Sequence, residues 1–156
     1  MRRILAAALC LLFPLTVVAG ESGYKVKYDG GSISDVKTGA DLRLEIAGNE
    51  IHLVRGHGDL VQVIPTSAIT EISYGQDVHR RVGAAIGLAA VSLGIGALMA
   101  LTKSKKHFVG LTWAQGDTKG GFAIQCDKSD YRGILTGLEG VTGKKAVDSD
   151  AMTVKN

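Results

Sequence analysis

The sequence lacks a surplus of charge of either sign, and this argues against one large class of proteins. Its 156 residues carry 18 Lys and Arg against 15 Asp and Glu, a net charge of +3 at pH 7. Two of these positive charges, Arg2 and Arg3, lie in an amino-terminal segment that we expect to be removed. The mature chain is then nearly neutral, whereas a polybasic nucleic-acid-binding protein needs a stripe of positive charge.

The first nineteen residues have the pattern of a secretory signal peptide. Arg2 and Arg3 precede the apolar stretch Ile4–Ala19, and the small residues Val17 and Ala19 suit a cleavage site. We therefore expect a signal peptide over residues 1–19 and an exported protein. An uncleaved signal anchor is the alternative interpretation.

Cysteine is scarce, and this excludes an intrachain disulfide in the mature chain. Cys10 leaves with the signal peptide, so Cys126 remains alone. A small exported domain without disulfides must be held by its hydrophobic core or by a membrane. Alternation places Phe122, Ile124 and Cys126 on one face of a strand, which predicts a buried core thiol.

A second apolar segment, Val82–Thr102, has 21 residues and no charge. As a helix it would be ~31 Å long, close to the thickness of the hydrocarbon core of a bilayer. Basic residues flank it on both sides. We predict an inserted membrane segment over residues 79–106, with the lipid bilayer as partner and head-group contacts from Arg80, Arg81, Lys103, Lys105 and Lys106.

Small residues recur at four-residue spacing within this segment. Gly83 and Gly87 form a GxxxG pair, and Gly94 lies four residues after Ala90. This spacing lets two helices approach closely in lipid and predicts a homo-oligomer packed through Gly83, Gly87 and Gly94. Two alternatives stay open: a span that simply faces lipid, and a helix buried in a water-soluble domain.

The rest of the chain predicts a mainly β domain closed by one helix. Short alternating strands are expected at 24–28, 42–46, 51–54, 60–64 and 69–74, a weaker one at 32–36, and a hairpin at 107–113 and 122–126. The period then changes, and apolar residues at helical spacing predict a helix over 127–141. Asp127 and Asp130 are placed to form a capping box, and Gly143 is expected to end the helix. Residues 144–156 are expected to form a frayed polar tail.

The order of several strands, a terminal hairpin and one amphipathic helix resembles the pleckstrin-homology-like folds, including bacterial PH-like and GRAM-like domains. Two passages carry the resemblance: Val63–Ile72, an apolar strand followed by Pro65 and an Ile-x-x-Ile pattern, and Phe122–Val141. It implies a small PH-like barrel or sandwich built from residues 20–78 and 107–143, and a binding or scaffold module for a protein or a lipid head group. The basic pattern that binds phosphoinositides is absent, because Asp29 follows Lys25 and Lys27.

One barrel built from both β parts conflicts with a single membrane span between them. The two parts must then lie on the same side of the membrane, so the segment must dip into the bilayer and return. A bend at Ser92–Gly96 would allow this. We favour the intact barrel over two separate β pieces.

The sequence also lacks the residue patterns of enzymes. His57 and Asp59 stand two apart on a turn, without further metal ligands or a catalytic partner. Gly140–Lys145 lacks the first glycine and the hydroxyl residue of a phosphate loop. We predict a non-catalytic envelope protein without metal or cofactor, associated with the inner membrane and with its main domain in the periplasm.

Overall fold

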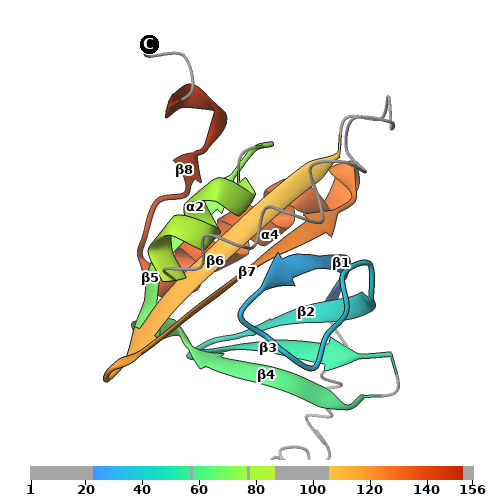
Figure 1. The fold of residues 1–156 in the computed structure, drawn as a ribbon. Coiled ribbons are helices and arrows are strands. Elements are labelled where there is room, and N and C mark those ends of the chain that lie inside the picture. Colours follow the sequence, from blue (N-terminus) through green and yellow to red (C-terminus); the bar gives the residue numbers. More distant parts are fainter. Residues whose placement is uncertain (1–22, 57, 77, 87–105, 153–156) are drawn as a thin grey trace, which may run out of the picture.

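The computed structural model describes residues 23–56, 58–76, 78–86 and 106–152 (Figure 1). Two helices longer than one turn accompany the strands: α2 (Val78–Ile86) and α4 (Lys128–Thr142). Single 3-10 turns, η1 and η2, cover Thr66–Ala68 and Asp150–Met152. The described strands are β1 (Gly23–Gly31), β2 (Asp41–Ala47), β3 (Glu50–Arg55), β4 (Leu60–Pro65), β5 (Ile69–Tyr74), β6 (His107–Gln115), β7 (Thr118–Cys126) and β8 (Val147–Asp148).

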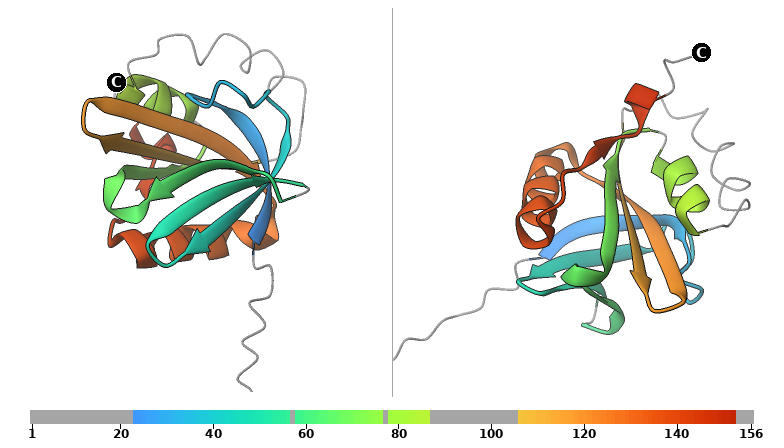
Figure 2. Two further views of the ribbon diagram at one scale, coloured as in Figure 1. Left: turned by 90° about the horizontal axis from the view of Figure 1, so that it is seen from below. Right: turned by 90° about the vertical axis from the view of Figure 1, so that its left-hand side faces the viewer.

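All eight described strands belong to one mixed sheet, so the prediction of a mainly β domain is confirmed. Their order is β4-β3-β2-β1-β7-β6-β5-β8, antiparallel except for the parallel pair of β5 and β8. The β1–β4 half crosses the β5–β7 half at a steep angle (Figures 1 and 2). Strands from before and after the apolar segment pair directly with each other, β1 with β7 and β5 with β6.

The main core lies between the sheet and α4. Ile134 and Leu138 of α4 are fully buried there, as the helical spacing predicted. Two glycines of α4 allow this close packing. A Cβ atom at Gly133 would lie 3.0 Å from the Tyr24 hydroxyl, and one at Gly137 would lie 2.9 Å from Cδ1 of Ile46.

Helix α4 begins and ends where the sequence predicted, but one predicted capping contact is absent. Gly143 adopts a left-handed conformation with φ 68°, and its N–H donates to the carbonyl of Glu139. Asp127 occupies the N-cap position, but its side chain makes no capping hydrogen bond. The predicted capping box with Asp130 is therefore wrong, and the Asp127 carboxylate is exposed instead.

Helix α2 covers the other face of β6 and β7. Val78 and Val82 are fully buried against Phe108 and Ala123, and they form a second, smaller core. Gly110 makes this approach possible, because a Cβ atom there would lie 2.5 Å from Cγ1 of Val78. Since β6 is covered on both faces, Phe108 is as buried as Val109 and Leu111, which lie on the opposite face of the strand.

Three segments differ from the expectations. The strand β1 continues through Asp29 and Gly30 with a bulge, beyond the expected range 24–28. The weaker strand expected at 32–36 is a turn. The tail is not wholly frayed, because β8 pairs with β5 and Ser149 is buried. The polar composition of this tail does not reveal the pairing, because the pairing depends on the edge of β5, which exists only in the folded sheet.

The first residues of the predicted membrane segment belong to α2, where Val82 and Gly83 are buried. Its remaining residues, 87–102, lie outside the described part of the chain. None of the described helices has both the length and the apolarity needed to cross a bilayer.

Candidate functional site

Residues 77–105, which we call the insertion, start and end at one point of the domain. The Gln76 side-chain amide donates to the carbonyl of Lys106 at 2.6 Å. The N–H of Gly75 donates to the carbonyl of Phe108 at 3.3 Å. The residue before the insertion is thus hydrogen-bonded to the residue after it. We call Gly75, Gln76 and Lys106, together with the polar residues around them, the base of the insertion.

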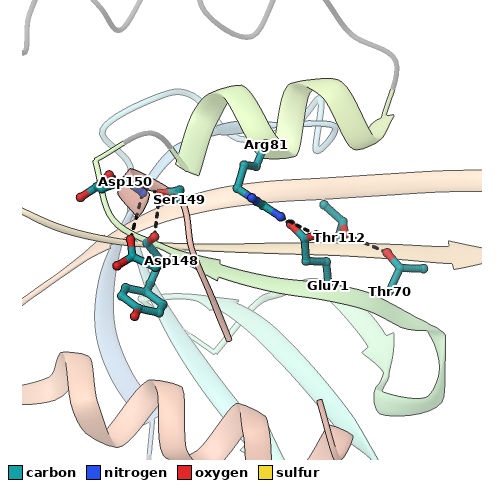
Figure 3. A network of polar contacts seen from close by, with 8 residues as sticks. Thr70, Glu71, Arg81, Thr112, Asp148, Ser149 and Asp150 are labelled. Atoms are coloured by element: carbon teal, nitrogen blue, oxygen red, sulfur yellow. Dashed lines mark hydrogen bonds and ion pairs between the residues drawn. The ribbon is translucent and has the colours of Figure 1, made fainter. Parts of the chain in front are cut away.

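The carboxyl-terminal segment closes over the same point (Figure 3). The N–H and the hydroxyl of Ser149 both donate to the carbonyl of Tyr74, at 2.8 and 2.6 Å. The Asp150 carboxylate accepts the N–H of Gln76 at 2.6 Å. Gly75 has φ +116°, and a Cβ atom there would lie 2.6 Å from the Ser149 hydroxyl, so only glycine fits. The tail therefore fixes the direction in which the chain leaves β5.

An ion pair attaches α2 to β5 at the base (Figure 3). Two guanidinium nitrogens of Arg81 donate to the two carboxylate oxygens of Glu71, each at 2.9 Å. These hydrogen bonds raise the pKa of Arg81, although partial burial opposes the shift. Arg81, which the sequence assigns to lipid head groups, thus has a partner within the domain.

The other predicted membrane residues are distributed as follows. Arg80 lies in α2, and Lys106 is partly buried at the base. Gly83 is buried within the chain. The head-group and helix-packing assignments stay predictions, because four of their residues lie outside the described part of the chain: Gly87, Gly94, Lys103 and Lys105.

A second polar pair at the base, Asp29 with His79, was not foreseen. The β1 bulge places the Asp29 carboxylate against α2, where its Oδ2 lies 2.5 Å from Nε2 of His79. The two side chains are only 14% and 10% exposed, and the imidazole packs edge-on against Phe108. The two atoms lie within ion-pair distance but not in hydrogen-bonding geometry. The Asp-Gly-Gly sequence was the available signal, and a bulge and a turn favour the same residues.

The remaining candidates do not converge. Asp59 is exposed on its turn, and His57 lies outside the described residues. His52 contacts Glu50 at 3.0 Å, and His107 packs on Tyr131. Within the described ranges, no group of three His, Cys, Asp or Glu side chains is arranged to hold a metal ion.

Cys126 is buried, as predicted. Only 5% of its surface is exposed, and its thiol lies 3.5 Å from the carbonyl of His107. Burial, reinforced by the nearby Asp130 and Asp127 carboxylates, raises the pKa of the thiol to about 12. It is therefore a neutral thiol at physiological pH and not a nucleophile.

A pocket of about 420 Å³ lies across β7, β1 and β2. We call it the trough. Two rows of side chains border it, and the buried row Cys126, Val26 and Leu42 runs between them. The first row holds Gln125, Lys27 and Asp41, and the second holds Asp127, Lys25 and Arg43. Its volume is in the range of small-molecule sites.

Comparison with known proteins gives no relationship from which to assign the site. No protein-family model matches the chain, and no curated protein matches it.

Proposed function

We propose that the chain is a non-catalytic, membrane-anchored envelope protein, and that its β domain binds a protein or a lipid head group at the periplasmic surface of the inner membrane. The observation that carries the proposal is the closed base of the insertion. Gln76 and Lys106 are hydrogen-bonded, and β5 pairs with β6. Both ends of the segment 77–105, which contains the apolar residues, therefore belong to one folded body.

The length of the insertion decides how it would meet a bilayer. Helix α2 is packed on the sheet, which leaves the 19 residues 87–105. A transmembrane helix needs about 20 residues for one crossing, so two crossings would need about 40. One crossing would put the two ends on opposite sides of the bilayer, and their place in one body argues against it. The proposed anchor is thus an apolar segment that enters the near leaflet and returns.

We also propose that the β domain is a PH-like module. Seven strands are followed by α4, which lies over the main core, and this order of elements supports the resemblance. A fold of this kind fixes no ligand, so the binding role depends on sites on its surface.

The membrane part of the proposal is tested by fractionating cells that produce the full chain. We expect the wild-type protein in the membrane fraction. Ile95→Asp places a carboxylate in the insertion, where it would lose its hydration on entering the apolar part of the leaflet, and it should move most of the protein to the soluble fraction. The matched control is Leu60→Asp, which changes a side chain that is 57% exposed on β4 and should remain in the membrane fraction.

The orientation is tested by labelling with a membrane-impermeant maleimide. Lys37→Cys lies before the insertion and Asp117→Cys after it, and both positions are exposed. We expect both cysteines to be labelled from the periplasmic side. Soluble wild-type protein, equal effects of the two Asp variants, or labelling from opposite sides would each contradict the proposal.

Self-association through Gly83, Gly87 and Gly94 was the second predicted function. No observation on the described residues favours it, since Gly83 is buried within its own chain. Replacing Gly87 and Gly94 with Ile and measuring the oligomeric state in detergent would test it.

A further inference from the structure

The trough lies on the same face of the sheet as α2. Along β1, the residues Lys25, Lys27 and Asp29 alternate with buried residues and therefore share one face. Asp29 contacts α2 through His79, and Lys25 and Lys27 border the trough. The trough thus continues the face of the sheet on which α2 packs.

The second row of the trough brings like charges together. Lys25 lies directly opposite Arg43 in the pairing of β1 with β2. Like charges in this position destabilise a sheet unless an anion compensates them. Arg43 forms an ion pair with Glu45, whose carboxylate lies 3.0 Å from its Nε. Lys25 has no ion-pair partner among the described residues.

An acid, Asp127, lies on the other side of Lys25 in this row. Asp127 directly follows Cys126, which pairs with Val26, so it continues the row that holds Lys25 and Arg43. Neighbouring strands are about 4.8 Å apart, which spaces the three positions evenly. The Asp127 carboxylate does not cap α4, forms no ion pair among the described residues and is exposed. In the other row, by contrast, Lys27 and Asp41 neutralise each other at 2.5 Å.

We propose that the trough binds a small zwitterion in which a short linker joins a primary ammonium group to an oxyanion. The ammonium is held by the Asp127 carboxylate, and the phosphate or carboxylate is held by Lys25 and Arg43. This inference deepens the proposed function, on which it rests, because it names the ligand class of the β domain. Two sources present this chemistry: the phosphoethanolamine head group of a lipid, and a free amino acid or amino-alcohol phosphate.

The first test uses soluble probes and does not depend on the membrane. Full chain in a nonionic detergent is titrated with phosphoethanolamine, inorganic phosphate and ethylammonium, and binding is followed by calorimetry. We expect phosphoethanolamine to bind at least tenfold more tightly than either half alone. Lys25→Gln and Asp127→Asn should each weaken its binding at least tenfold. Lys128→Gln, an exposed neighbour that does not border the trough, is the matched control and should leave binding unchanged.

A stability measurement guards against loss of fold as the explanation. Without ligand, Lys25→Gln removes the like-charge contact with Arg43 and should leave the thermal midpoint unchanged or raise it. Inorganic phosphate binding as tightly as phosphoethanolamine would overturn the inference, and so would an Asp127→Asn variant with undiminished affinity.

A second test separates the two sources. The full chain is mixed with phosphatidylethanolamine vesicles and with phosphatidylcholine vesicles, whose quaternary ammonium has no N–H to donate. A preference for the former that Asp127→Asn abolishes assigns the lipid head group. Binding of the soluble probe without a vesicle preference assigns the free zwitterion. If the chain ignores all bilayers but binds the soluble probe, the anchoring proposal fails and the ligand assignment stands.

Discussion

Gly110 is the position at which the attachment of α2 can be perturbed most cleanly. A Cβ atom there would lie 2.5 Å from Cγ1 of Val78, 2.6 Å from the Ser73 hydroxyl and 2.8 Å from Cγ2 of Val82. All three distances are shorter than real Cβ contacts. Valine is stiff about χ1, so the two valines cannot rotate away and α2 must move outward.

The expected cost of Gly110→Ala follows from overpacking. Extra carbon atoms in a packed core cost about 1–3 kcal/mol, and here they act on two fully buried side chains, so we expect about 2 kcal/mol. The main core on the other face of the sheet should be little affected. Amide hydrogens of α2 should therefore exchange faster, while those of β1–β4 keep their protection.

The assay combines urea unfolding with hydrogen exchange on the full chain in detergent. Gly56→Ala is the control, because a Cβ atom at that exposed position meets nothing within 4 Å. Val82→Ala makes room above Gly110, so the double variant should lose less than the sum of the two single losses. Unchanged stability and unchanged exchange in Gly110→Ala, or fully additive losses in the double variant, would refute this reasoning.

Three further predictions concern α4 and its neighbours. Gly140→Ala should raise the free energy of unfolding by about 1 kcal/mol in urea titrations, since nothing lies within 4 Å of the added Cβ. Gly133→Ala places its Cβ against Tyr24, so it should raise the free energy of unfolding by less, or lower it. Hydrogen bonds from the Ala146 N–H and the Lys145 ammonium lower the pKa of Glu139. The ionised Glu139 carboxylate therefore stabilises the fold fully above its ordinary pKa of 4.5, and this contribution disappears as the pH falls through the folded-state pKa. Glu139→Gln should flatten the acid side of the thermal-stability profile, and parallel acid slopes would contradict this. Cys126 should react with a disulfide reagent at pH 8 only as fast as the domain unfolds, because its thiol is buried and has a pKa of about 12. Modification of the native protein at the rate of an exposed thiol would contradict this.

The sequence by itself determined the elements whose character is local. Alternation located most of the strands, and helical spacing located α4 and its buried residues Ile134 and Leu138. The end of α4 at Gly143 and the burial of Cys126 were also predictable. These features follow from the period of the chain and the conformations that single residues allow, and neither depends on distant partners.

The tertiary structure alone decided how distant parts meet. The pairing of β5 with β6 across the insertion, the docking of α2 above Gly110 and the contact of Asp29 with His79 join residues that no local pattern relates. Hydropathy cannot distinguish burial of Val82 against a sheet from burial in lipid, because both remove the same apolar surface from water. The charges of the trough were visible in the sequence, but only strand register placed Lys25 opposite Arg43 and aligned Asp127 with them.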